Sequence, residues 1–321
     1  MIQPDMSKTI VLGMCTKDEE DSIRKSMESI RSQTRDPDYV FICDASNDTT
    51  PDIIRDELEK SDIPFEVFRQ EQYSGHGGAR QELYERIQDV NPDIFCMLDA
   101  ANAANSDWIN NIENFWEDNP EYDALTGPSC DQDVNRECST PHDPLYYRHA
   151  AIALDVSLLD TIGGWDPGFD RGEDWDFALQ MYRAGADVFT SSRWCSKYLN
   201  SEPSNIYRKR IAGNPTSVPY LYKYGTWYAK FHPVQIIKDI GSVFFYIITT
   251  ILALVLAFAP QYTTSVVSIF TIYSVGFILG SVFYEDKFQL HNFKRALFLL
   301  LYTAPAAARS TKKVIQGKYQ R

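Results

Sequence analysis

Ile94-Phe-Cys-Met-Leu-Asp-Ala-Ala-Asn102 is the stretch that decides the fold, because five successive apolar residues run into a single carboxylate. An uninterrupted apolar run of this length predicts a strand that is buried on both faces of a parallel sheet. Asp99 then lies where this strand meets its loop, and ligands of open α/β sheets bind at that edge. Two interpretations follow: Asp99 is a ligand of a cation that holds a diphosphate, or its carboxylate caps the loop.

Around this stretch, strand patterns alternate with helix patterns. We expect strands at 9–15, 39–43, 65–68, 122–126 and 150–154, and helices at 23–30, from about 52, at 79–90, from about 105 and at 157–162. This alternation predicts an α/β fold with a mostly parallel sheet and right-handed crossovers. The loops that follow the strands should therefore meet at one edge of the sheet.

A glycine-rich segment, Tyr73-Ser-Gly-His-Gly-Gly-Ala-Arg80, precedes the helix expected at 79–90. Glycines let the backbone approach a ligand closely, and a helix N-terminus favours an anion. The segment lacks the Gly-Lys-Ser/Thr ending of a P-loop. On its own it therefore indicates a binding loop without identifying the ligand.

Three acids, Glu173, Asp174 and Asp176, crowd another expected helix start. Acids in a first helical turn complement the helix dipole, which is their simplest explanation. Carboxylates packed beside Trp165 and Trp175 would also repel one another and lose solvent. Both effects raise a carboxyl pKa, as a general base requires.

Composition limits the partners of the chain. Lys and Arg number 31 against 44 Asp and Glu, so the formal net charge is −13 and a nucleic-acid partner is not expected. Eight basic and two acidic residues lie from Glu285 to the C-terminus, so the remainder is more acidic still. Such an acidic part fits a high-salt cytoplasm, as in a halophilic archaeon, with an ordinary acidic enzyme as the alternative.

The six cysteines are scattered, and no metal-binding spacing is recognisable among them. We interpret them as structural thiols of a reduced compartment, although Cys130 and Cys138 share a polar loop and could pair. The first eight residues have no apolar segment, so no cleaved signal peptide is expected before the first strand.

Two uncharged segments, 240–259 and 265–284, are each long enough to cross a hydrocarbon core of about 30 Å, and together they predict a membrane hairpin. Basic residues precede and follow the hairpin, which places both flanking parts in the cytoplasm. The shorter apolar segment 296–308 predicts an interfacial helix near anionic headgroups. We therefore divide the chain into a cytoplasmic α/β domain (1–225), the membrane hairpin (226–284) and a basic tail (285–321).

Together, these motifs resemble the family-2 glycosyltransferases with the nucleotide-diphospho-sugar-binding fold called GT-A, in the family's order over about 9–185. Thr16-Lys-Asp-Glu19 is similar to the family's Thr-x-Asn-Glu, with Asp18 in place of Asn and Cys15 in place of the usual Pro. Cys43-Asp-Ala-Ser-Asn-Asp48 is similar to its Asp-Asp-Gly-Ser-x-Asp. The resemblance implies that Thr16, Glu19, Asp44, Arg80 and Asp99 form the nucleotide-sugar site, with Asp44 recognising the nucleobase and Arg80 near the diphosphate.

Glu173-Asp-Trp-Asp176 resembles the family's Glu-Asp-x-Asp, whose first Asp is the catalytic base of inverting members. The resemblance therefore implies that Asp174 is the base, with Glu173 and Asp176 beside it in the catalytic group. The His often found further downstream in the family is missing. Arg193 or Lys197 could supply the positive charge that stabilises the leaving group instead.

One departure concerns the metal that the resemblance implies, Mg²⁺ or Mn²⁺. The family's Asp-x-Asp begins here at Asp99, but its closing position is Ala101. Three interpretations remain: a cation held by Asp99, water and phosphate oxygens with help from Asn102; chemistry without a metal; or a copy that has lost catalysis. Mg²⁺ commonly keeps several waters and binds one or two carboxylates, which makes the first acceptable.

We thus expect a membrane-anchored inverting glycosyltransferase that moves a sugar from a nucleotide donor to a lipid-linked acceptor, resembling haloarchaeal enzymes that use dolichyl phosphate or dolichol-linked oligosaccharide in protein glycosylation. A degenerate membrane scaffold is the alternative, suggested by Ala101. A sugar-1-phosphate nucleotidyltransferase would need a basic, glycine-rich loop after the first strand, where this chain has the acidic Thr16-Lys-Asp-Glu19.

Overall fold

The computed structural model describes residues 8–138, 150–199, 217–231 and 311–319, together with the single helical residues 236, 240, 248 and 251. The chain divides into two compact units, Met1–Ser201 and Glu202–Arg321. The first unit contains the α/β domain, and the second contains α8 (Ser217–Tyr224) and α9 (Thr226–Phe231).

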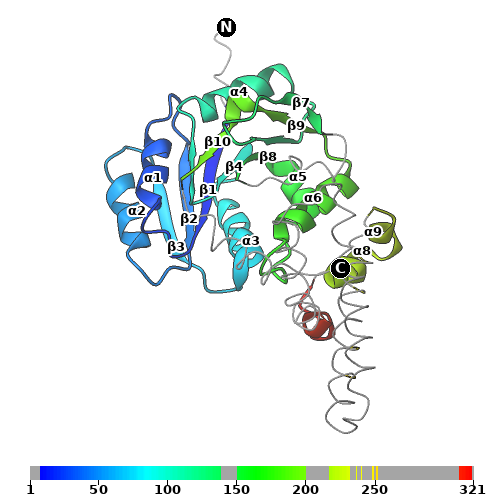
Figure 1. The fold of residues 1–321 in the computed structure, drawn as a ribbon. Coiled ribbons are helices and arrows are strands. Elements are labelled where there is room, and N and C mark those ends of the chain that lie inside the picture. Colours follow the sequence, from blue (N-terminus) through cyan, green and yellow to red (C-terminus); the bar gives the residue numbers. More distant parts are fainter. Residues whose placement is uncertain are drawn as a thin grey trace, which may run out of the picture. The chain divides into compact units, whose positions relative to one another are not determined.

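An eight-stranded sheet forms the centre of the first unit, in the order β3-β2-β1-β4-β8-β6-β9-β7 (Figure 1). Its strands are β1 (Ile10–Thr16), β2 (Tyr39–Asp44), β3 (Phe65–Arg69), β4 (Ile94–Leu98), β6 (Ala124–Thr126), β7 (Asn135–Cys138), β8 (Ala151–Asp155) and β9 (Val188–Ser191). The first four strands are parallel, β8 and β7 run against their neighbours, and β6 and β9 are parallel to each other. The predicted mostly parallel α/β sheet is therefore confirmed.

Helices cover both faces of this sheet (Figure 1). The bounds of the helices are α1 (Ile23–Arg31), α2 (Thr50–Leu58), α3 (Gly75–Ile87), α4 (Trp108–Asp118), α5 (Val156–Ile162) and α6 (Glu173–Ala184). Buried apolar residues of α1, α2 and α4 form one core with β1 and β4, and those of α3, α5 and α6 form a second core on the opposite face. Because side chains alternate along a strand, β1 contributes Leu12 to the first core and Val11 to the second.

Five short elements of the first unit were not expected from the sequence. They are β5 (Asn102–Ala104), β7, β9, η1 (Ser192–Trp194) and β10 (Ser196–Tyr198). β5 and β10 pair with each other in a separate two-stranded sheet, with Tyr198 opposite Asn102. Three-residue strands carry too little sequence pattern to be recognised, because their pairing partner supplies most of their stability.

The glycine-rich segment differs from its prediction. Helix α3 begins at Gly75 rather than at Ala79, so the glycines form its first turn. A Cβ on Gly77 would lie 2.6 Å from the carbonyl oxygens of Asp166 and Phe169, and one on Gly75 would lie 2.5 Å from Cα of Asp170. Because real Cβ atoms do not approach so closely, these glycines permit α3 to pack against the loop at 166–170.

The membrane prediction falls largely on residues that the structure leaves undescribed. Almost all of the predicted membrane part lies outside the described residues, namely the spans at 240–259 and 265–284 and the interfacial segment at 296–308. The exceptions are the single helical residues 240, 248 and 251. Within the described part of the chain, no helix combines the length and apolar character that crossing a membrane requires.

Candidate active site

The predicted site residues meet at the edge of the sheet where the parallel strands end. Thr16 and Asp44 are the last residues of β1 and β2 and lie side by side in register, and Asp99 directly follows β4. Helix α3 contributes Arg80, and the first turn of α6 contributes the acids 173–176. The carboxyl ends of parallel strands share one edge, which explains why residues up to about 160 positions apart converge here.

Arg80 connects two of the predicted carboxylates. Its Nη1 bonds to Oε1 of Glu173, and its Nη2 donates to Oδ1 of Asp99 at 3.3 Å. The side chains of Arg80 and Glu173 are 7% and 6% exposed, whereas that of Asp99 is 45% exposed. Burial lowers the pKa of Arg80, but the charges of Glu173 and Asp99 outweigh this effect, so its pKa is raised and it stays protonated. Arg80 thus holds the end of β4 against the start of α6.

Asp174 follows Glu173 in the first turn of α6. Burial and then the negative charge of Glu173 raise its pKa to about 6, although Arg80 opposes the shift. One carboxylate oxygen, Oδ1, accepts a bond of 2.8 Å from the backbone N–H of Trp175. A carboxylate with a pKa near 6 is largely ionised at neutral pH and still binds a proton far better than an ordinary Asp. Asp174 therefore has the properties of a general base.

Asp176 lies one residue further along the same turn, with a different environment. It is 1% exposed, and its Oδ2 accepts a bond of 3.0 Å from Nε2 of Gln180. Its backbone N–H donates to the carbonyl of Gly172, whose φ of 80° makes the sharp turn into α6. These contacts show that Asp176 is buried and stabilises the start of α6.

His76, on the first turn of α3, is a further neighbour that the sequence reasoning did not single out. Its Nδ1 lies 3.9 Å from Oε1 of Glu173, and its side chain is 55% exposed. Loss of solvent, followed by the charges of Arg80 and Arg171, lowers the pKa of His76. The imidazole is therefore neutral at pH 7 and can donate or accept a hydrogen bond without adding charge.

The first N–H groups of α3 are used within the protein. The N–H of His76 donates to the carbonyl of Asp170 and that of Gly77 to the carbonyl of Phe169, both at 3.0 Å. The expectation that this glycine loop offers its backbone to an anion is therefore wrong for these two groups. They instead tie α3 to the loop that leads into Glu173.

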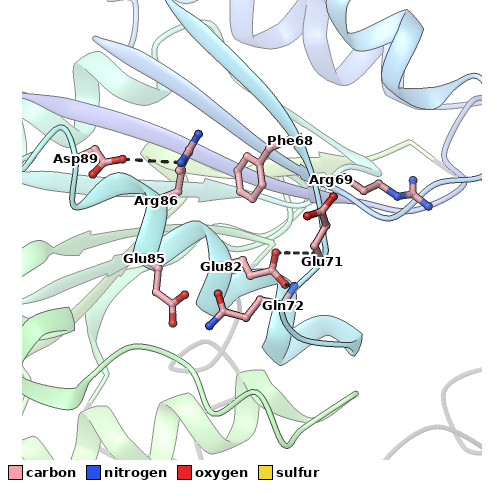
Figure 2. Close-up of a pocket in the computed structure, with 8 residues that line it drawn as sticks. All are labelled: Phe68, Arg69, Glu71, Gln72, Glu82, Glu85, Arg86 and Asp89. Carbon is pink, nitrogen blue, oxygen red and sulfur yellow. Dashed lines mark hydrogen bonds and ion pairs between the residues drawn. The ribbon is translucent and has the colours of Figure 1, made fainter.

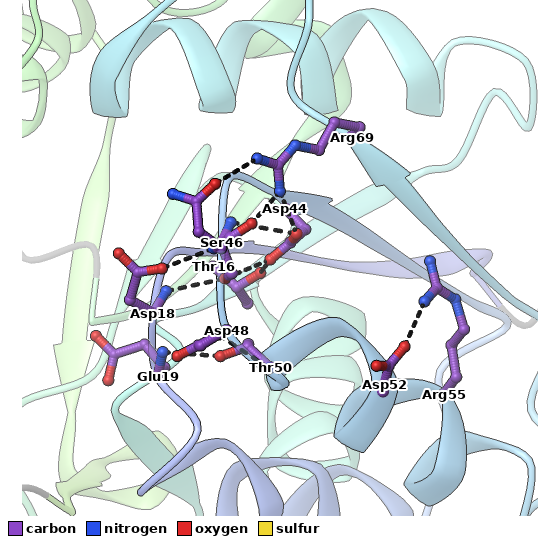
Figure 3. A network of polar contacts seen from close by, with 11 residues as sticks. Thr16, Asp18, Glu19, Asp44, Ser46, Asp48, Thr50, Asp52, Arg55 and Arg69 are labelled. Carbon is purple, nitrogen blue, oxygen red and sulfur yellow. Dashed lines mark hydrogen bonds and ion pairs between the residues drawn. The ribbon is translucent and has the colours of Figure 1, made fainter.

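Asp44 and Thr16 belong to a hydrogen-bonded network at the ends of β1, β2 and β3 (Figure 3). Thr16 Oγ1 donates to Oδ1 of Asp44 at 2.7 Å, and Arg69 Nη1 donates to its Oδ2 at 3.1 Å. Glu19 lies in the loop after β1, where its backbone N–H donates to Thr50 Oγ1 at 2.9 Å. Arg69 is a member of this network that the sequence analysis missed, although its place at the end of β3 could have suggested it.

Asn102, which the sequence analysis considered as a further cation ligand beside Asp99, is buried. Asn102 is 5% exposed, and its Oδ1 lies 3.4 Å from the Ser196 hydroxyl that donates to it. The prediction that Asn102 helps to hold a cation is therefore wrong, because its side chain is committed to the β5–β10 pair. Among the described residues, no group of three or more His, Cys, Asp or Glu side chains is arranged to bind a metal ion.

Two basic residues of the sequence could stabilise the leaving group. Arg193 lies in η1 and Lys197 in β10, and both are exposed. Lys197 is opposite Ala103 of β5, two residues after the missing second Asp at Ala101. Of these two residues, Lys197 therefore lies beside the segment that follows Asp99.

The cysteines differ from the prediction in two respects. Cys130 and Cys195 form a disulfide, so the prediction of structural thiols is wrong for these two. Cys130 is also not paired with Cys138, and the disulfide instead joins the loop after β6 to the residue before β10. Cys43 and Cys96 are buried free thiols, and burial raises the pKa of each. They are thus structural thiols, as expected.

A surface hollow of about 430 Å³ lies beside this site, between β3 and the outer side of α3 (Figure 2). Most of its charged side chains already have partners: Glu82 accepts bonds from the backbone N–H groups of 71–73, and Arg86 pairs with Glu66. It contains none of the carboxylates joined by Arg80. We therefore do not assign the reaction to this hollow.

The α/β fold with its mostly parallel central sheet is of the GT-A type. The family model "Glycosyl transferase family 2" matches residues 12–167. Residues 12–167 are thus similar to a family-2 glycosyltransferase domain. No curated protein matches the chain.

Solved structures share the fold at low sequence identity. The mannosyltransferase PcManGT from Pyrobaculum calidifontis, in complex with GDP-Man and Mn²⁺, is 15% identical, with a TM-score of 0.55 over 95% of this chain and 88% of that one. S. aureus TarS 1–349 is 16% identical, with a TM-score of 0.51 over 67% and 64%. A TarS complex with UDP is 18% identical, with a TM-score of 0.49 over 62% of each chain. The chain thus spans less than two thirds of the TarS structures that it matches.

Proposed function

We propose that this protein is a membrane-anchored, inverting glycosyltransferase that moves a sugar from a nucleotide-diphospho-sugar to a lipid-linked acceptor. The observation that carries the proposal is the group formed by Asp99, Arg80, Glu173 and Asp174. It combines a base of raised pKa with a buried positive charge and an accessible carboxylate. Acid–base chemistry on a phosphorylated donor needs these elements together.

In the proposed reaction, Asp174 takes the proton of an acceptor hydroxyl; with a phosphate acceptor such as dolichyl phosphate, which needs no base, Asp174 positions the acceptor instead. The acceptor oxygen forms a bond to the anomeric carbon of the sugar, and the bond from that carbon to the diphosphate oxygen breaks on the opposite face. The nucleoside diphosphate leaves with the electron pair of the broken bond. Arg80 lies next to the developing negative charge and also keeps Asp174 largely ionised before proton transfer.

A divalent cation fits this site in a limited way. Asp99 offers an accessible carboxylate whose Oδ1 is bonded to Arg80, and water and phosphate oxygens would supply the other ligands. Bound there, Mg²⁺ or Mn²⁺ would neutralise charge on the leaving diphosphate. The Mn²⁺ complex of PcManGT supports the use of such a cation.

The acceptor and location are inferred from the sequence outside the α/β domain. Two uncharged segments at 240–259 and 265–284 and the basic tail favour an acceptor in the membrane, with the catalytic domain on the cytoplasmic face. Dolichyl phosphate or a dolichol-linked oligosaccharide in protein glycosylation fits the acidic composition of a halophilic archaeal protein. In the tail, Ile315 is 80% exposed beside Lys312 and Lys313, as an interfacial segment requires.

Transfer from a panel of labelled nucleotide sugars to lipid extract, with membranes that contain the full chain in high salt, tests the proposal. We expect labelled lipid that a chelator abolishes. Transfer that persists with chelator would show that Asp99 acts without a cation. Nucleotide binding without transfer across the panel would favour the degenerate scaffold.

The role of Asp174 has its own test. Asp174→Asn should bind nucleotide normally and lose about 10²- to 10⁴-fold in turnover, the usual contribution of a general base. Asp160→Asn is the matched control, because Asp160 is an exposed α5 carboxylate whose Oδ1 accepts a bond from Tyr84. Unchanged turnover of Asp174→Asn would remove Asp174 from the mechanism.

A further inference from the structure

The carboxylate of Asp44 has no acceptor position left for a ligand. Its Oδ1 accepts bonds from Thr16 Oγ1 at 2.7 Å and Ser46 Oγ at 2.6 Å. Its Oδ2 accepts bonds from Ser46 N at 3.2 Å and Arg69 Nη1 at 3.1 Å. An ionised carboxylate offers about four lone-pair positions, and Asp44 is 3% exposed. All four are therefore taken by the protein itself (Figure 3).

This arrangement changes which kind of nucleobase the strand ends can recognise. A base that donates an N–H to a carboxylate, as the N3–H of uracil does, would first have to displace one of these four donors. Displacing a bond to a buried charged group leaves that donor without its partner and costs free energy. The network consequently disfavours recognition through Asp44.

Arg69 offers the opposite chemistry at the same place. Its Nη1 is occupied by Asp44 and the carbonyl of Ser46, and its Nη2 donates to Oδ1 of Asn47 at 3.4 Å. Within the part of the chain that the structure describes, its Nε has no hydrogen-bond partner, and one hydrogen of Nη2 is unused. The Nε–H is parallel to the Nη2 hydrogen on its own side, and together they form one fork of the guanidinium. The side chain is 47% exposed, so a ligand in solution can reach it.

We propose that Arg69, held in place by Asp44, Ser46 and Asn47, reads the nucleobase of the donor through this fork. Two parallel donors match two neighbouring acceptors, which guanine presents at O6 and N7 and cytosine at N3 and O2. Uracil has a donor between its two acceptors, and adenine has a donor beside N7. The donor class is therefore a guanosine or cytidine diphospho-sugar. This inference rests on the proposed function and narrows its donor.

Calorimetric titration of the full chain in detergent with GDP, CDP, UDP and ADP tests the inference directly. We expect GDP or CDP to bind at least tenfold more tightly than UDP and ADP, and the better of the two identifies the base. Equal affinities, or tightest binding of UDP or ADP, would overturn it while leaving the proposed function intact. Failure of all four nucleotides to bind would contradict both.

A variant pair assigns the preference to the fork. Arg69→Lys keeps the charge but not the two parallel donors, so the four affinities should converge to within about threefold. Arg86→Lys is the matched control, because Arg86 borders the same hollow but pairs with Glu66, and it should keep the wild-type preference. A preference retained by Arg69→Lys would remove Arg69 from this role. The titrations of the unmodified chain decide the inference even if Arg69→Lys folds poorly.

Discussion

Replacing Arg80 by Met tests the central feature of the site, because it removes the positive charge between two carboxylates and keeps the apolar stem of the side chain. Glu173 would be left buried at 6% exposure without its guanidinium partner. Removing one partner of a buried ion pair costs about 3–5 kcal/mol, since the remaining charge keeps its desolvation penalty. For a domain of this size, each kcal/mol lowers the melting temperature by about 2–4 °C. We therefore expect Arg80→Met to melt roughly 6–20 °C below the wild type at pH 7.

The pH dependence of this loss follows from the Glu173 pKa, which burial already raises in the wild type. Without Arg80, which opposes that rise, it would move higher still. A carboxyl with a raised folded-state pKa binds more protons in the folded than in the unfolded state, so stability falls as pH rises through that pKa. The melting difference between variant and wild type should accordingly grow with increasing pH.

The assay is thermal unfolding of the full chain in detergent between pH 4 and 8, with Arg31→Met as control. Arg31 donates to Glu57, another carboxylate that is 1% exposed, but Arg24 and Lys60 also contact Glu57. The control should therefore lose less stability than Arg80→Met. An Arg80→Met variant that melts within about 2 °C of the wild type at pH 7 would refute the reasoning, since this shift is under 1 kcal/mol.

Three further expectations use other parts of the structure. Because burial and Glu173 raise the pKa of Asp174 to about 6, kcat/KM should rise about tenfold per pH unit below pH 6 and level off above it; a profile flat down to pH 5 would exclude this base. Gly77→Ala should lower stability by about 1–3 kcal/mol and also lower turnover, because its Cβ would press on the loop before Glu173. Gly163→Ala should lower stability through its φ of 78° and leave turnover unchanged. Thermal melting and steady-state kinetics of the two variants measure both effects. Cys130→Ser opens the 65-residue loop closed by Cys195 and should lower stability by about 4 kcal/mol under oxidising conditions. A wild type whose melting temperature is the same with and without reductant would contradict this.

The sequence by itself determined most of the longer strands and helices and the types of group at the site. The run Ile94–Leu98 predicts the buried central strand, and Asp99 follows it because a loop begins there. The acids at 173–176 predict the start of α6, since the dipole and the flanking glycine at 172 favour it. Such features depend on neighbours within a few residues, and local pattern therefore reveals them.

Only the tertiary structure decided which groups meet. Arg80 bonds to a glutamate 93 residues away, and Cys130 pairs with a cysteine 65 residues away rather than with Cys138 in its own loop. The glycines before Arg80 fit a ligand loop in sequence but serve packing, because the 166–170 loop occupies the space in front of them. Asp44 likewise matches a base-binding residue in sequence, whereas its saturation depends on donors from three strand ends and their loops. A hydrogen-bond partner or a steric neighbour is a property of three-dimensional proximity, and spacing along the chain does not encode it.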